Sequence, residues 1–251
     1  MNKENNKIGA VIQARMGSTR RPGKSLYPFA GRPMIEHIVR RIQLIPGLDL
    51  VALAIPDLQS EQALVDAVSA TGVRIIQGPE DDVLERYVMA GDALSLTHIA
   101  RICGDCPWVD LELAERLIES HLATGADFSA SADPVPLGSG LEIIKLDALK
   151  AAARESFEPY HKEHVAPFII ERPERFHLNW MPAPQYLAHK ECRLTVDTEE
   201  DLQFQDRLCA ELTTSPLYAQ SVESILSLLE SRPDLLQINA TIPQKDWRKE
   251  K

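Results

Sequence analysis

The segment Ile8-Gly-Ala-Val-Ile-Gln13 runs directly into Ala14-Arg-Met-Gly-Ser-Thr-Arg-Arg-Pro-Gly-Lys24. The first part is a short apolar run, which predicts a buried strand. The second part is a glycine-containing, strongly basic loop. Gly17 and Gly23 would let backbone N–H groups come close to a phosphate, and arginine and lysine side chains supply positive charge. This strand and loop together predict a polyphosphate site at the end of the first strand.

The spacing of the loop excludes a Walker A motif. Five residues rather than four separate Gly17 from Gly23, and one of them is Pro22. An arginine-rich loop of this kind suits a nucleoside triphosphate whose leaving group is pyrophosphate. A solvated basic loop is the ordinary alternative, but the position directly after a buried strand favours phosphate binding. The loop sequence is compatible with either phosphate contact or solvent exposure of Arg20 and Arg21.

Strand and helix patterns alternate through the first half of the chain, which predicts an α/β fold with a mainly parallel sheet between helices. The expected strands are Ile8–Gln13, Leu50–Ile55, Val73–Gln77, His98–Ile102 and Asp127–Ala130. The expected helices are Pro33–Leu44, Ser60–Thr71, Asp81–Leu96 and Leu111–His121. In such sheets ligands bind beyond the carboxyl ends of strands, where the basic loop and the Cys103–Asp110 loop both fall.

The pattern changes after Asp133, and we expect one domain over residues 1–251 with an insertion at 133–190 that serves as a lid or a dimerisation arm. Within and beyond it we expect further elements. The strands are Leu141–Lys145, Phe176–Met181 and Cys192–Val196, and the helices are Asp147–Ser156, Lys162–Arg172, Thr198–Leu212 and Ser221–Ser231.

Composition narrows the class of protein. The formal net charge of −10 argues against nucleic acid or an anionic membrane as the main partner. The polar N-terminal residues lack the apolar core of a signal peptide, and no apolar run is long enough to cross a bilayer. The four cysteines are dispersed except for one pair. We therefore expect a cytoplasmic protein with reduced thiols.

Two aspartates stand at predicted strand ends. Asp105 lies in Arg101-Ile-Cys-Gly-Asp-Cys-Pro107, and Asp197 closes Arg193-Leu-Thr-Val-Asp197. Each alone could be a turn or helix-capping residue. Together they form a plausible Mg²⁺ site, because magnesium takes one or two carboxylates plus phosphate oxygens.

Two further patterns carry competing interpretations. Cys103-x-x-Cys106 could be a redox or zinc pair, but no second such pair or nearby histidine pair supports zinc, and the strand context fits a redox motif less well. In the segment Tyr160-His-Lys-Glu-His164, the histidines could contact an anionic substrate or metal, or simply belong to a surface helix.

Several motifs in order along residues 8–245 resemble the cytidylyltransferase family that includes the CMP-Kdo and CMP-sialic acid synthetases. Within that family the nearest branch is spore coat polysaccharide biosynthesis protein F. Three positions depart from the usual residues: Arg21 for leucine, and Cys103 and Ala166 for threonine. The matching pieces are Gln13-Ala-Arg-Met-Gly-Ser-Thr-Arg20, Pro22-Gly-Lys24, Asp81-Asp-Val-Leu-Glu-Arg-Tyr87, Arg101-Ile-Cys-Gly-Asp-Cys-Pro107, Glu163-His-Val-Ala-Pro167, Arg193-Leu-Thr-Val-Asp-Thr-Glu-Glu-Asp201, Ile238-Asn-Ala240 and Gln244-Lys245.

The resemblance implies a Rossmann-like three-layer α/β/α nucleotidyltransferase fold, often dimeric, that joins CTP to an acidic sugar and releases pyrophosphate. By position, the catalytic residues would be Arg15, Lys24, Asp105 and Asp197. The first two would bind the triphosphate, and the two aspartates would hold Mg²⁺. The expected nucleotide-binding set is Gln13, Ala14, Arg15, Gly17, Ser18, Lys24, Gly78 and Arg101.

We place acceptor recognition in the 133–190 region. His161, Lys162 and His164 or Arg193 would lie near an acceptor carboxylate, and Glu142 would bind acceptor hydroxyls. No general base can be assigned, and a metal-activated hydroxyl is one possibility. The acceptor could instead be a sugar phosphate, a polyol phosphate or a phosphonate. A non-catalytic nucleotide-binding protein is a third interpretation, against which the retained charged residues argue.

Overall fold

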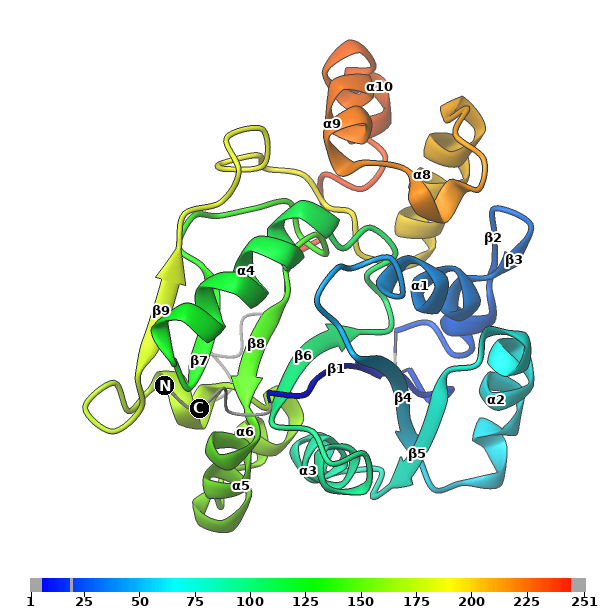
Figure 1. Ribbon diagram of the computed structural model, residues 1–251. Coiled ribbons are helices and arrows are strands. Elements are labelled where there is room, and N and C mark those ends of the chain that lie inside the picture. The colour runs from blue at the N-terminus through cyan, green and yellow to red at the C-terminus, as the bar shows by residue number, and fades with distance from the viewer. Residues whose placement is uncertain (1–5, 19, 245–251) are drawn as a thin grey trace.

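A single seven-stranded sheet forms the centre of the molecule (Figure 1). The computed structural model describes residues 6–18 and 20–244, so the polar start of the chain, Thr19 and Lys245 lie outside the described residues. The strand order is β5-β4-β1-β6-β8-β7-β9. The strands are β1 (Ile8–Gln13), β4 (Leu50–Pro56), β5 (Arg74–Gly78), β6 (His98–Cys103), β7 (Phe128–Ser131), β8 (Glu142–Lys145) and β9 (Leu178–Met181), with a separate β2–β3 hairpin (Pro28–Phe29 and Arg32–Pro33).

The first strand lies at the centre of the parallel part of the sheet. It pairs in parallel with β4 on one side and β6 on the other. Its residues Ala10, Val11 and Ile12 are fully buried, which is why the strand is a continuous apolar run rather than an alternating one. Among the seven described strands of this sheet only β8 runs antiparallel, between β6 and β7. The predicted mainly parallel sheet is confirmed.

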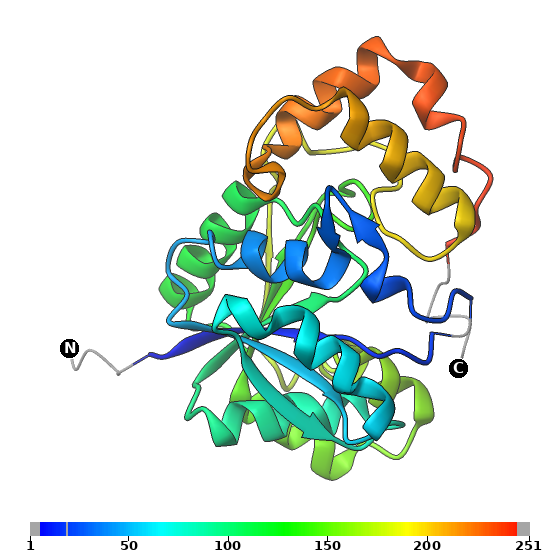
Figure 2. The same ribbon diagram turned by 90° about the vertical axis from the view of Figure 1, so that its right-hand side faces the viewer.

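Helices cover both faces of the sheet, as the sequence predicts (Figure 2). Successive residues of β1 point to opposite faces, so Ile12 joins one core and Val11 the other. One core contains α1 (Met34–Ile42), α2 (Gln62–Val68) and α4 (Leu111–Thr124); the other contains α3 (Val83–Ala93), α5 (Leu146–Glu155) and α7 (Pro167–Ile170), with α6 (Pro159–His164) packed against α3.

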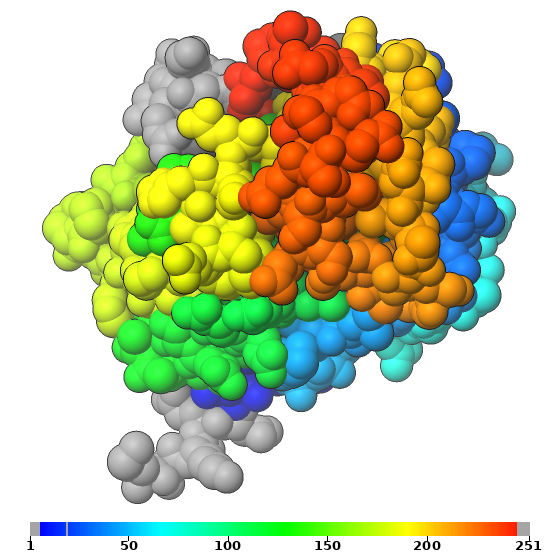
Figure 3. Space-filling view, turned by 90° about the horizontal axis from the view of Figure 1, so that it is seen from above, coloured from blue at the N-terminus to red at the C-terminus, as the bar shows by residue number. Residues whose placement is uncertain are grey.

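Three C-terminal helices form an additional cover on the α1 side of the molecule, and Figure 3 shows them from above. They are α8 (Glu199–Glu211), α9 (Val222–Ser231) and α10 (Pro233–Leu236). Short 3₁₀ turns complete the described elements: η1 (Lys24–Leu26), η2 (Gln59–Glu61), η3 (Ser69–Thr71) and η4 (Leu217–Ala219).

Two predicted elements are wrong in detail. The helix expected over Lys162–Arg172 is two short helices, because Val165 has a left-handed backbone (φ 69°) and Pro167 has no N–H to continue the first helix. The segment Cys192–Val196 is not a strand. It makes one isolated bridge, between Arg193 and Leu137, and then bonds a different loop. Its apolar residues Leu194 and Val196 are nevertheless fully buried in the core on the α1 side of the sheet.

Residues 133–190 contribute two strands to the sheet, since β8 lies in its interior and β9 at its edge. A role for this region in acceptor binding or in a dimer stays a prediction. No helix within residues 6–18 and 20–244 has the length and apolar character needed to cross a membrane.

Candidate active site

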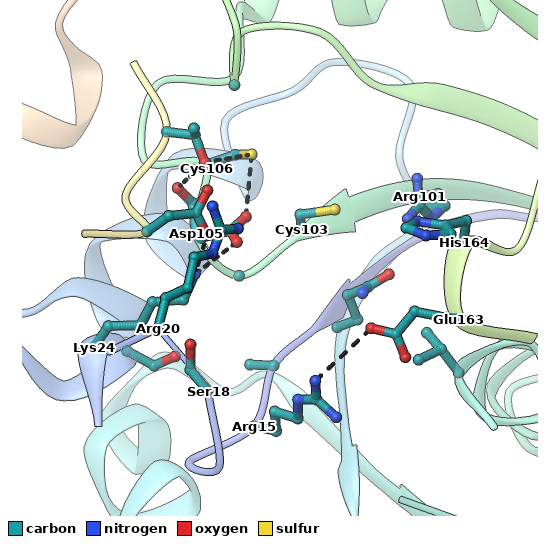
Figure 4. Close-up of a pocket in the computed structure, with 18 of the residues that line it drawn as sticks. Arg15, Ser18, Arg20, Lys24, Arg101, Cys103, Asp105, Cys106, Glu163 and His164 are labelled. Carbon is teal, nitrogen blue, oxygen red and sulfur yellow. Dashed lines mark hydrogen bonds and ion pairs between the residues drawn. The ribbon is translucent and has the colours of Figure 1, made fainter. Parts of the chain in front are cut away.

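A pocket of about 500 Å³ lies beyond the carboxyl ends of β1 and β6 (Figure 4). This is the edge of a parallel sheet at which ligands are expected. The basic loop after β1 and the loop after β6 form much of its wall. The lining residues are Gln13, Ala14, Arg15, Ser18, Arg20, Lys24, Ser25, Val83, Arg86, Arg101, Cys103, Gly104, Asp105, Cys106, Leu137, Gly138, Glu163, His164, Thr195, Asp197 and Gln244.

Lys24 joins the two predicted metal ligands. Gly23 takes a left-handed backbone (φ 73°), which starts the short turn η1 and directs Lys24 inward. The Lys24 Nζ donates to Asp105 Oδ2, to Asp197 Oδ1 and to the Val196 carbonyl oxygen, each at 2.8 Å. Burial alone would lower the pKa of Lys24, but the charges of both aspartates outweigh it and raise the pKa. The ammonium is therefore retained, with all three protons in use.

Asp197 is held from several directions. Arg20 contacts its Oδ1 at 2.8 Å, and Arg193 donates to its Oδ2 at 2.7 Å. Burial opposes ionisation of Asp197, but Lys24, Arg20 and Arg193 lower its pKa. Arg193 also bonds both carboxylate oxygens of Asp201, at 2.8 and 3.0 Å. Asp197 is thus a fixed carboxylate at the pocket wall.

Three contacts fix the loop after β1. The backbone N–H of Met16 donates to Glu61 Oε2 at 2.9 Å, and Glu61 is almost fully buried. The Tyr87 hydroxyl lies 3.1 Å from Gln13 Oε1. Gly104 N–H donates to the Gln13 carbonyl at 2.8 Å, an approach so close that a Cβ on Gly104 would lie 2.6 Å from that oxygen. The start of the loop is therefore set by neighbours from distant parts of the sequence.

The opposite wall comes from α3 and α6. Glu163 faces Arg15 across the pocket at 3.8 Å (Figure 4). Arg86 donates to the carbonyl oxygens of Pro79 and Glu80 at 2.5 and 2.8 Å, while its Nε has no hydrogen-bond partner within the described part of the chain. His164 lines the pocket beside Glu163. Charged groups of both signs therefore lie within reach of a bound molecule.

The cytidylyltransferase family profile matches residues 10–245. The chain belongs to this family. A spore coat polysaccharide biosynthesis protein, SpsF of Bacillus subtilis, is 31% identical over 234 residues, which cover 91% of this chain and 96% of that protein. An uncharacterized protein of Methanocaldococcus jannaschii is 32% identical over 243 residues, covering 96% and 98% of the two chains.

Solved structures share the fold of this cytidylyltransferase. A cytidylyltransferase from Leptospira borgpetersenii superposes with a TM-score of 0.87 at 25% identity, covering 95% of this chain and all of that one. A CMP-2-keto-3-deoxy-manno-octonic acid synthetase complexed with CTP superposes with a TM-score of 0.62 at 21% identity, over 82% of this chain. The predicted Rossmann-like nucleotidyltransferase fold is confirmed.

Most of the expected nucleotide-binding residues of the cytidylyltransferase lie together in the pocket lining, including Arg15, Lys24 and Arg101. Gly17 and Gly78 do not line it. A Cβ on Gly78 would lie 2.9 Å from Met89 Sδ and 3.0 Å from Arg86 Cγ, so this glycine allows α3 to pack closely.

The five residues expected to bind the acceptor are dispersed. His164 lines the pocket, whereas Glu142 pairs with Arg101 at 2.9 Å just behind the lining. His161 is buried between Ser156 Oγ (2.9 Å) and Glu171 Oε2 (3.1 Å). Arg193 lies behind Asp197 and not in the lining. Lys162 pairs with Asp82 at 3.0 Å and is not in the lining. Of the five, the structure brings only His164 to the pocket wall.

Sequence reasoning missed several residues of the lining in this cytidylyltransferase, namely Arg86, Gly138, Glu163, Thr195 and Gln244. Arg86 and Glu163 lie inside motifs that carry the family resemblance. Their place in those motifs could have identified them as site residues. Glu61 carries no comparable signal, because its role depends on a contact with Met16.

The donor set at Asp105 and Asp197 fits a divalent cation that also binds phosphate. Both carboxylates reach the same Lys24 nitrogen, so their oxygens are neighbours. Within the described residues there is no group of three or more histidine, cysteine, aspartate or glutamate side chains placed to hold a metal. Two carboxylates with ligand oxygens match magnesium, which seldom uses an all-protein cage.

Proposed function

We propose that this cytidylyltransferase transfers CMP from CTP to a hydroxyl of an acidic sugar, a nonulosonic acid or a Kdo-like sugar, and releases pyrophosphate, in surface polysaccharide biosynthesis. The observation that carries the proposal is the gathering of Arg15, Arg20 and Lys24 with Asp105 and Asp197 around one pocket. The CTP-complexed synthetase and the spore coat polysaccharide relative support the nucleotide and the pathway class.

The cations of the loop would bind the triphosphate. Arg15 is one-third exposed, and its pairing with Glu163 at 3.8 Å is too long to hold it strongly. It can therefore turn toward a phosphate at little cost. Displacement at the α-phosphorus depends mainly on in-line positioning and charge neutralisation, which these side chains supply.

Asp105 and Asp197 would hold a divalent cation, Mg²⁺ in our proposal. Such an ion supplies charge stabilisation to phosphate oxygens when bound. The residues of this chain prepare the ligands: Arg193 and Asp201 fix Asp197, and the Cys106 thiol donates to Asp105 Oδ1 at 3.4 Å. These contacts orient both carboxylates before any ligand arrives.

The other wall would bind the acceptor. Arg86 has an unpartnered, buried Nε beside the pocket, which suits the carboxylate of an acidic sugar. Glu163 could accept hydrogen bonds from sugar hydroxyls, and His164 lies next to it. We therefore place acceptor recognition at Arg86, Glu163 and His164, and not at His161 and Arg193.

The test is pyrophosphate release from each of the four nucleoside triphosphates with Mg²⁺ and a panel of acceptors. The panel contains acidic sugars, sugar phosphates, polyol phosphates and phosphonates. We expect turnover with CTP and an acidic sugar, and loss of turnover in a folded Asp105→Asn variant. Turnover only with a phosphorylated acceptor would support the alternative acceptor class. CTP binding without turnover on the whole panel would favour a non-catalytic role.

A further inference from the structure

Two cysteines flank Asp105 in the loop after β6. Cys103 is the last residue of the strand, and the backbone N–H of Cys106 donates to its carbonyl oxygen at 3.2 Å. A hydrogen bond from the N–H of residue i+3 to the carbonyl oxygen of residue i closes a β-turn, in which the two Cα atoms lie within about 7 Å. A disulfide requires a Cα separation of roughly 4.4–6.8 Å. The turn therefore holds the two cysteines in a range that a disulfide can bridge.

Both cysteines are reduced and face the nucleotide pocket. All four cysteines of the chain are free, but only Cys103 and Cys106 line the pocket (Figure 4). Cys192 and Cys209 lie elsewhere, partly buried against the apolar core. A small molecule that enters the pocket would therefore meet this pair of thiols and not the other two.

A metal centre does not account for the pair. The described part of the chain holds no group of three or more side chains placed as metal ligands, although Asp105 stands between the two cysteines. Thiolate metal sites usually need four ligands, or three with an open position. The remaining chemistry of two adjacent thiols is oxidation to a disulfide.

We propose that Cys103 and Cys106 are a reversible oxidation site that forms a disulfide when a hydroperoxide enters the pocket. One thiol sulfur attacks a peroxide oxygen, the O–O bond breaks, and water leaves with a sulfenic acid on that sulfur. The second thiol attacks this sulfur, the S–S bond forms, and a second water leaves. Two thiols and one hydrogen peroxide thus give one disulfide and two waters, and a dithiol reductant reverses the change.

The disulfide would disturb the site at Asp105. In the reduced state the Cys106 Sγ donates to Asp105 Oδ1 at 3.4 Å, and Thr195 Oγ1 donates to the Asp105 carbonyl oxygen at 3.0 Å. Oxidation removes the thiol proton and pulls the turn that carries Asp105. We infer that the oxidised form binds CTP more weakly, a consequence that rests on the proposed function. Coupling of this kind is reciprocal, so bound CTP should oppose disulfide formation.

The experiment uses the full chain, treated with hydrogen peroxide, alkylated with iodoacetamide, digested and analysed by mass spectrometry. We expect a Cys103–Cys106 peptide lighter by two hydrogens, with Cys192 and Cys209 alkylated in the same sample as internal controls. Dithiothreitol should restore alkylation of the pair. Cys103→Ser and Cys106→Ser should each abolish the disulfide, whereas Cys192→Ser should keep it.

Pairing with Cys192 or Cys209, or oxidation of a single cysteine to sulfinic acid with no disulfide, would overturn the proposal. The link to the nucleotide is measured separately by calorimetric titration of CTP. We expect the oxidised protein to bind CTP at least roughly fivefold more weakly than the reduced protein, which is within the usual range of such couplings. Equal CTP affinity of the oxidised and reduced forms would contradict the effect on nucleotide binding but not the disulfide itself. If the reduced protein binds no CTP, the proposed function fails while the disulfide is still decided by mass.

Discussion

Lys24 Nζ lies 2.8 Å from Asp197 Oδ1, and Arg20 contacts the same carboxylate oxygen. Equally short bonds to Asp105 and to the Val196 carbonyl use the other two ammonium protons. Lys24 therefore stands where a cation shared by the two carboxylates would be expected. It cannot keep all three bonds and also donate to a triphosphate, so its proposed role requires this bridge to open when nucleotide binds.

Replacing Lys24 by methionine should let a divalent cation reach the carboxylates in the absence of CTP. The variant removes a positive charge in contact with both Asp105 and Asp197, so we expect Mn²⁺ to bind the free protein roughly tenfold more tightly or better. Electron paramagnetic resonance titration of Mn²⁺ measures this without any turnover. Lys190→Met, which removes a lysine paired with Glu230 at the surface, is the control. Equal affinities in the wild type and the Lys24 variant would contradict the prediction.

Replacing Arg193 by glutamine should destabilise the fold. Its guanidinium is buried between Asp197 and fully buried Asp201, and removing it leaves two carboxylates without their partner. Breaking a buried ion pair typically costs about 3 kcal/mol or more. The exposed Arg232, paired with Asp234 and Glu211, is the matched control and should cost less than about 1 kcal/mol. Urea unfolding measures both. A stable Arg193 variant whose only change is a raised KM for the acceptor would instead support the predicted role of Arg193 near the acceptor carboxylate.

Gly104→Ala and Gly17→Ala separate close packing from phosphate contact. A Cβ on Gly104 would lie 2.6 Å from the Gln13 carbonyl oxygen and 2.8 Å from Ala14 Cβ, so the basic loop must shift. We expect a loss of about 1–3 kcal/mol in stability and weaker CTP binding. At Gly17 the nearest atom is Glu80 Oε1 at 3.8 Å, and the protein should keep its stability. Weaker CTP binding by a stable Gly17 variant would support the predicted backbone contact with phosphate, and unchanged binding would refute it.

The sequence predicted those parts of the molecule that depend on local pattern. The strand Ile8–Gln13 matches the structure residue for residue, because a fully buried parallel strand is a continuous apolar run. The basic loop and the Cys103–Asp110 loop were both expected beyond the carboxyl ends of strands. They lie there, after β1 and β6, and Lys24 contacts Asp105 at 2.8 Å.

Contacts between distant segments could not be predicted in this way. His161 is placed in the interior by Ser156 and Glu171, and nothing in its own segment distinguishes it from His164 at the pocket wall. Cys192–Val196 has the composition of a strand, but its backbone bonds two different loops, at Leu137 and at Asp105. Both outcomes depend on tertiary packing, which overrides local preference.

Stability should fall as the pH drops below about 6.5, because two buried histidines resist protonation. Burial, reinforced by Arg41, lowers the pKa of His37 to about 3, and burial, reinforced by His98, Lys145 and His177, lowers that of His121 to about 3. One ring nitrogen of each has no hydrogen-bond partner within the described residues, so an added proton would have no acceptor. Between about pH 6.5 and pH 3 the unfolded chain therefore binds protons that the native protein does not. The free energy of unfolding should decrease toward acid by up to about 1.4 kcal/mol per pH unit for each histidine.

Urea unfolding between about pH 7 and pH 5 measures this slope, above the pH range where carboxylates contribute. His121→Gln should remove about half of it, whereas His189→Gln, at an exposed position, should leave it unchanged. An unchanged slope in the His121 variant would show that this histidine is already protonated, or solvated, in the native protein.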